Sequence, residues 1–138
     1  MKRRRLIEGW AIIGTVGLAG CAGLPGFADD FDVGMSPNAY HPTSIEVSVG
    51  DTVVWYNDGS RGHTVTAYED AIPEGGAYFA SGGFSTEAEA REEWEVREGG
   101  NIVTGEFYRH TFEVAGHFPY FCVPHEGGGM IADVWVTE

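Results

Sequence analysis

Four residues of this sequence carry side chains that together suit a soft metal ion. Cys122 is followed three residues later by His125, and Met130 stands five residues beyond that histidine. His63, far upstream, offers a second imidazole. Two imidazoles, one thiolate and a weak thioether form the ligand set of blue-copper electron-transfer sites, because they compromise between the preferences of Cu(I) and Cu(II). The residue types and their spacing therefore predict one type 1 copper ion bound by these four side chains.

Such a site needs rigid elements, since a fixed ligand geometry limits the rearrangement between the two oxidation states of copper. Alternating apolar residues at 45–49 have the period of a half-buried strand. Further short strands are expected at 52–56, 63–67, 105–114, 117–122 and 131–136. Turn signals separate these segments and no long helix is expected, so the pattern predicts an all-β sandwich. Cys122 then ends one strand, Met130 begins the next, and His125 lies on the turn between them.

Residues 68–101 differ from the rest of the domain because they are rich in Glu and Gly and poor in β-branched residues. A short helix is predicted at 85–93. Thr86 and Glu89 are spaced as a capping box, and Glu87 and Arg91 as an i,i+4 ion pair. We expect this segment to be an acidic excursion on the surface, with solvated charges that need no functional role.

The first 20 residues are expected to be an export signal. A basic head at positions 2–5 precedes an apolar stretch that is shorter than the roughly 18 to 20 residues that span a bilayer. Paired arginines before Leu6 and Ile7 resemble a twin-arginine signal, and residues 18–21 resemble a lipobox. We therefore expect export, lipidation at Cys21, a flexible tether at 21–29 and a folded domain at 30–138. The protein is therefore expected to be anchored on the extracellular face of the cell membrane.

Two alternatives exist for Cys21. It can be an incidental residue at an ordinary cleavage site, or it can form a disulfide with Cys122, as two cysteines of an exported protein often do.

The charge of the chain limits its partners. The 138 residues carry a net charge of −13, but four of the 8 basic residues lie at positions 2–5, and Glu8 alone among the 21 acidic residues precedes Cys21. The chain beyond Cys21 therefore has a charge of −16 and contains no Lys. Such a surface repels nucleic acid and anionic lipid. We expect a monomer with a solvated surface and no nucleic-acid partner.

The motif around His63, together with the run Tyr120-Phe121-Cys122-Val123-Pro124-His125 and Met130, resembles the plastocyanin family of cupredoxins over roughly residues 30–138. Within that family the acidic chain and the lipoprotein-like head are most similar to the halocyanins of halophilic archaea. The resemblance implies a Greek-key, cupredoxin-like β-sandwich with one type 1 copper. It assigns His63, Cys122 and His125 as equatorial ligands and Met130 as the axial ligand.

The same resemblance implies a one-electron shuttle between membrane-associated redox proteins, which would dock near His125. The chain departs from many plastocyanins at Thr64, where they have Asn. The backbone N–H of Thr64 is still expected to donate a hydrogen bond to the Cys122 sulfur.

Two other functions use the same residues differently. The chain can be an extracellular copper-binding or copper-delivery module without electron transfer, or a metal-free adhesive sandwich. Enzymatic activity is not expected, because the sequence shows no catalytic triad and no second copper motif. His41 is expected to be exposed, and His110 and His117 are interpreted as structural residues.

Overall fold

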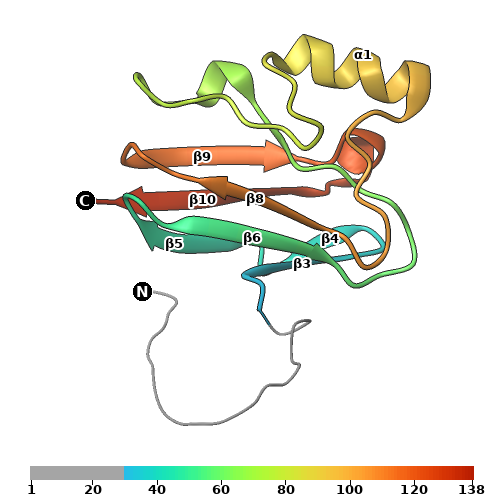
Figure 1. Cartoon of the computed structure of the whole chain (residues 1–138), viewed down its shortest axis with the longest axis horizontal. Helices are drawn as coiled ribbons and strands as arrows, with labels where there is room; N and C mark the ends of the chain where they lie inside the picture. The colour runs from blue at the N-terminus through green and yellow to red at the C-terminus, as the bar shows by residue number, and fades with distance from the viewer. Residues whose placement is uncertain (1–29) are drawn as a thin grey trace, which may run out of the picture.

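The structure is a computed structural model that describes residues 30–138 (Figure 1). The predicted export signal, the lipidation site at Cys21 and the tether lie outside the described residues. Among the helices of residues 30–138, none has the length and apolarity that a membrane crossing requires.

Two four-stranded sheets form the domain. One contains, in spatial order, β5 (Ser44–Ser48), β10 (Ile131–Thr137), β9 (Gly116–Phe121) and β7 (Thr66–Ala67). The other contains β4 (Ala39–His41), β3 (Val33–Ser36), β6 (Thr52–Asn57) and β8 (Phe107–Thr111). Both are mixed, since β5 runs parallel to β10 and β3 parallel to β6, while the other pairs are antiparallel. The predicted β-sandwich is confirmed.

The core lies between the two sheets and follows the alternation of the strands. On β10, Ala132, Val134 and Val136 are buried, whereas Ile131 and Trp135 are exposed. The inward side chains of β9 and β6 meet them, and several large aromatic residues fill the centre: Trp55, Phe79, Phe112, Phe118 and Tyr120. These rings contact one another edge-on or tilted, which favours one fixed packing of the interior.

Helical segments are short and lie outside the sheets. They are η3 (Glu69–Ala71), α1 (Glu87–Arg97) and η4 (Val123–Gly128). The predicted helix is confirmed and extends beyond position 93, until Glu98 adopts a left-handed conformation with φ 55°. The capping box forms only in part: the Thr86 side chain accepts a hydrogen bond from the Glu89 N–H, but the Glu89 carboxylate accepts from Ser85 instead of Thr86.

Two strand predictions need correction, and two strands were not predicted. The segment 63–67 contains only the two-residue strand β7, because the residues before it pair with other partners, and β8 is shorter than the predicted 105–114. Strands β3 and β4 were not predicted, since each has at most four residues and no clear alternation. His41 ends β4 and is exposed, as expected.

His110 on β8 is expected to make stability depend on pH. Its ring stacks on Phe79 at a centroid distance of 4.6 Å and meets Phe112 edge-on at 4.7 Å. Burial lowers the pKa of His110 below its usual 6.5. Because the folded state favours the neutral ring, the stability that this group contributes is present above pH 6.5 and is lost as the pH falls through the lower folded pKa.

We therefore expect His110→Phe, which keeps an aromatic ring that cannot ionise, to lose less melting temperature between about pH 7 and pH 5 than the native chain. Thermal melts of the metal-free proteins at both pH values measure this difference. Equal losses in the two proteins would show that His110 does not contribute.

Candidate metal centre

The structure brings three of the four predicted ligands together. The Cys122 Sγ lies 3.7 Å from Nδ1 of His63 and 3.4 Å from Nδ1 of His125. All three candidate ligand atoms lie within 4.8 Å of one another, although His63 is 59 residues away from Cys122 in sequence. Within residues 30–138 no other group of three His, Cys or acidic side chains converges in this way.

The segment that carries His63 is held by backbone pairing and by one buried amide. His63 forms a two-way bridge with Ile102, whose carbonyl accepts the His63 N–H at 3.2 Å and whose N–H donates back at 2.7 Å. The fully buried side chain of Asn57 donates to the carbonyls of Arg61 and Ile102 at 2.6 and 2.8 Å. Asn57 therefore fixes both the chain just before His63 and the segment that pairs with His63.

Gly62 leaves room for the Asn101 side chain next to that ligand. A Cβ at this position would collide with the side-chain amide of Asn101. Asn57 directly follows the predicted strand at 52–56, and no pattern in the sequence indicates that its side chain supports His63.

The other ligands lie on residues 122–130, which we call the ligand loop. The Cys122 carbonyl accepts from the His125 N–H at 3.1 Å, and the Met130 N–H donates to the His125 carbonyl at 3.2 Å. The Cys122 N–H donates to the Met130 carbonyl, and Gly129 turns the chain with φ 93°. A left-handed residue of this kind favours glycine. These bonds hold the backbone of the three residues in one compact turn.

Thr64 ties the two ligand segments together. Its backbone N–H donates to the Cys122 sulfur at 3.4 Å, which confirms the predicted bond. Its hydroxyl also accepts the Val123 N–H at 2.9 Å and contacts the Thr66 hydroxyl at 2.8 Å. Bonds of this kind orient ligands and tune the metal.

Burial sets the ionisation of the three groups. It lowers the pKa of His63 to about 4, with a further contribution from nearby His125, and it lowers the pKa of His125 as well. Both imidazoles are therefore neutral at pH 7, the form that binds a metal. Burial also raises the pKa of the Cys122 thiol, and the Thr64 N–H opposes that effect. A bound metal cation reverses this preference and stabilises the thiolate.

The geometry fits a metal of first-row size. Metal bonds of about 2.0 Å to nitrogen and about 2.3 Å to sulfur at 120° place the two ligand atoms about 3.7 Å apart, close to the two observed separations. The Cys122 thiol is free and fully buried. Met130 is buried, and its backbone is hydrogen-bonded to Cys122 and His125 within the ligand loop. The donor set of two imidazoles and a thiolate suits copper.

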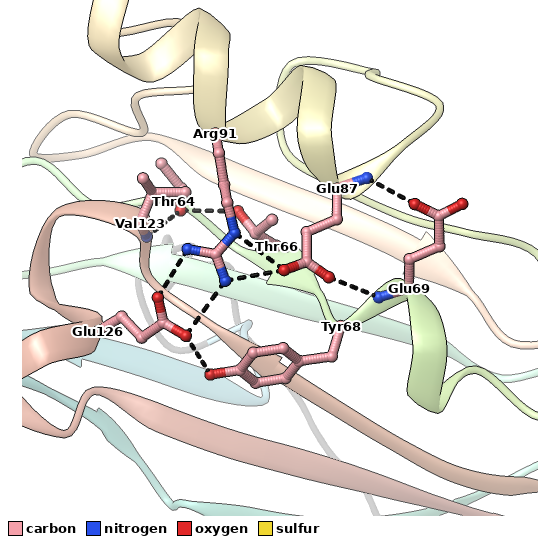
Figure 2. A network of polar contacts seen from close by, with 8 residues as sticks. All are labelled: Thr64, Thr66, Tyr68, Glu69, Glu87, Arg91, Val123 and Glu126. Carbon is pink, nitrogen blue, oxygen red and sulfur yellow. Dashed lines mark hydrogen bonds and ion pairs between the residues drawn. The ribbon is translucent and has the colours of Figure 1, made fainter.

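One expectation from the sequence is wrong. Arg91, on the acidic excursion, does not carry a merely solvated charge. Its guanidinium pairs with Glu126 at 2.8 Å, next to His125, and with Glu87 at 2.8 Å, as Figure 2 shows. The predicted Glu87–Arg91 pair is confirmed, but the contact with the ligand loop lies 35 residues away in sequence and no local pattern indicates it.

The other histidines do not join the site. His117 on β9 stacks on Trp135 at 3.9 Å and pairs with Asp133 at 2.8 Å, while His110 lies among Phe79 and Phe112. These contacts are structural, in agreement with the interpretation from the sequence.

With the β-sandwich and its two imidazoles and one thiolate established, comparison with known proteins identifies the class. The chain belongs to the copper binding proteins of the plastocyanin/azurin family, whose description matches residues 30–137. These cupredoxins are blue copper electron-transfer proteins, and copper is the cofactor of the family.

Individual relatives are plastocyanins. The chain is 31% identical over 97 residues to plastocyanin of Scenedesmus fuscus, covering 70% of this chain and 85% of that protein. It is 33% identical over 99 residues to plastocyanin of Vicia faba, with 72% and 88% covered. For the chloroplastic plastocyanin of Tetradesmus obliquus, 30% identical over 97 residues, the match covers 70% of this chain and 57% of that protein.

Solved structures agree on the fold. A purple cupredoxin from Nitrosopumilus maritimus superposes with a TM-score of 0.55 at 23% identity, over 78% of this chain and 100% of that one, which speaks for the fold alone. A reduced variant of amicyanin gives a TM-score of 0.51 at 26% identity, over 75% and 78% of the two chains.

Proposed function

We propose that this protein is a one-electron carrier whose copper ion is bound by His63, Cys122 and His125 in a trigonal arrangement, with Met130 as the weak axial ligand. The convergence of one thiolate sulfur and two imidazole nitrogens from distant parts of the chain carries this proposal. When bound, copper supplies the electron by cycling between Cu(I) and Cu(II). It is a carrier and not an enzyme, in keeping with its family.

The residues of the site contribute rigidity and exclusion of water. His63 and Cys122 are fully buried, and the Thr64 N–H donates to the sulfur from a fixed backbone. Pairing of His63 with Ile102 fixes the backbone that carries that imidazole. Ligands held in this way need little rearrangement when the charge of the site changes, and this favours fast electron transfer.

Partners are proposed to dock around His125. Its ring is half-buried, and the neighbouring residues Val123 and Pro124 are half-buried too, while Gly127 to Gly129 are exposed. Small and apolar residues leave a weakly polar surface above the site. Such a surface suits brief contacts with redox proteins of a membrane electron-transport chain.

We further propose that the protein is a halocyanin, exported and anchored to the outer face of the cell membrane through a lipid on Cys21, and that it works as a monomer. The strongly acidic chain beyond Cys21, with no Lys, supports this proposal, as do the residues before Cys21. Mass spectrometry of the protein purified from membranes tests it: a lipid-modified N-terminal Cys21 is expected, and an unmodified one would overturn the anchor.

The function is tested by loading the purified domain with Cu(II). We expect an intense blue absorption band and the narrow copper hyperfine splitting of a type 1 site, and reversible one-electron reduction. A protein that binds no copper in equilibrium dialysis would overturn the proposal. Loss of copper within seconds to a mild chelator, without reversible reduction, would instead favour copper delivery.

Salt provides a test of the docking surface. At about 1 M salt the Debye length is about 3 Å, so the acidic surface steers partners weakly and apolar contact near His125 has to dominate. We expect the rate of reduction by a partner to change little when salt is raised above that level, as measured by stopped flow. A rate that collapses with added salt would show that charge pairing dominates docking.

A further inference from the structure

The helix of the acidic excursion contacts the ligand loop. Figure 1 shows α1 on the outside of the sandwich, and the elements that it touches include β7 and η4, the turn that carries His125. Yet α1 fully buries only Ala90, so apolar packing holds it weakly. Specific polar contacts must therefore explain why it lies where it does.

Arg91 provides those contacts. Its two terminal nitrogens donate to both carboxylate oxygens of Glu126, at 2.8 and 3.2 Å, and the Tyr68 hydroxyl donates to the same carboxylate at 2.6 Å (Figure 2). The guanidinium also lies 4.3 Å from the ring centroid of Phe121. Phe121 directly precedes Cys122, and Glu126 directly follows His125. Arg91 thus holds the chain on both sides of two proposed ligands.

The opposite side of Arg91 is anchored too. Glu87 accepts from its Nε at 2.9 Å, and the other Glu87 oxygen accepts the Glu69 N–H at 2.9 Å. The Glu69 carboxylate accepts the Glu87 N–H at 3.0 Å in return. We call Tyr68, Glu69, Glu87, Arg91 and Glu126 the Arg91 network. It connects η3, α1 and the ligand loop in one continuous set of bonds.

We propose that Arg91 is a positioning residue that immobilises the ligand loop, and that the acidic excursion exists in part to deliver it. This inference rests on the proposed function, in which that loop carries Cys122, His125 and Met130. An isolated surface ion pair contributes little, but a bidentate pair within a network of several charges is the exception. The Arg91 and Glu126 side chains are 39% and 28% exposed, so solvent weakens the pair only in part.

Arg91 could instead tune the reduction potential of the site through its charge alone, and this role predicts a different pattern among variants. Removing the positive charge of Arg91 and removing the negative charge of Glu126 would then shift the reduction potential in opposite directions. Immobilisation instead predicts that both changes loosen the loop in the same way. Arg91→Lys further separates charge tuning from immobilisation, because it keeps the positive charge and loses the planar guanidinium that binds a carboxylate at two points.

The experiment compares Arg91→Gln, Arg91→Lys, Glu126→Gln and the double variant that carries both Arg91→Gln and Glu126→Gln with the native chain. In the metal-free protein, we expect hydrogen exchange of the Gly129 and Met130 amides, which close the loop onto Glu126 and His125, to be about tenfold faster in all four. In the copper-loaded protein, release of copper to a chelator is expected to accelerate by a similar factor. The double variant should be no worse than Arg91→Gln alone.

Arg97→Gln is the matched control, since Arg97 makes an i,i+4 pair with Glu93 on the same helix. It should leave loop exchange and copper release unchanged. Three results would each overturn the inference. Loop hydrogen exchange could stay at the native rate in Arg91→Gln, Arg91→Lys could exchange and release copper as the native chain does, or Arg97→Gln could accelerate both processes as much as Arg91→Gln. Failure of the proposed function is distinguishable, because it appears as a missing blue band in the native protein.

Discussion

Changing Cys122 to Ser is expected to abolish the blue colour of the copper-loaded protein. The intense band of a type 1 site arises from the thiolate bound to copper, and a serine oxygen offers neither the soft donor nor the charge transfer. The sulfur lies 3.7 and 3.4 Å from the two imidazole nitrogens, so no other described side chain can replace it. Copper affinity should fall by more than the about 10- to 100-fold loss that follows removal of an outer-shell partner.

Absorption and EPR spectra of the loaded variant measure this effect, and dialysis against buffered copper measures the affinity. Cys21→Ser makes the same chemical change at the other cysteine and should leave the colour intact. The metal-free Cys122→Ser protein should still fold, because the hydroxyl can accept the Thr64 N–H that now donates to the sulfur. A blue band that survives in this variant would refute the ligand assignment.

The candidate ligands were predictable because their signal is local or chemically rare. Cys122, His125 and Met130 lie within nine residues, and a thiolate, an imidazole and a thioether so close together favour a soft metal ion such as copper. The strands beside them were predictable for a similar reason, since alternation on β10 and β9 follows from the burial of one face.

What could not be predicted depends on contacts between distant segments. The bond of Asn57 to Ile102 spans 45 residues, and that of Arg91 to Glu126 spans 35. Each residue has an ordinary local explanation, Asn57 as a turn former and Arg91 as a helix surface charge. Only the tertiary structure places them beside the ligand segments. Strands β3 and β4 were missed for a related reason: so short an element is stabilised by its neighbours and not by its own pattern.

The site therefore consists of two kinds of residue. The candidate ligands determine which metal can be bound, and supporting residues from β6, from the segment before β7 and from α1 determine how firmly these ligands are held. The fold brings both kinds to one end of the sandwich, where His63 and the ligand loop meet. Thr64 is the clearest link, because its N–H contacts the sulfur and its hydroxyl holds Val123.

Changing Asn57 to Leu is expected to produce the largest loss of stability among the polar residues that support the ligands. The side chain is fully buried and makes three hydrogen bonds, to the carbonyls of Arg61 and Ile102 and from the N–H of Gly59. Leucine has a similar size but satisfies none of them. A polar group left unpaired in the interior costs about 1 to 3 kcal/mol, so the metal-free domain should lose about 3 kcal/mol and melt roughly 13 °C lower.

The same change should loosen His63, because Ile102 accepts hydrogen bonds from both the Asn57 side chain and the His63 N–H. Copper release to a chelator is therefore expected to accelerate together with the fall in melting temperature. Asn38→Leu makes the same exchange at an exposed turn position and serves as the control, with both properties near their native values. If Asn57→Leu melts lower but releases copper at the native rate, Asn57 supports the fold without holding the first ligand.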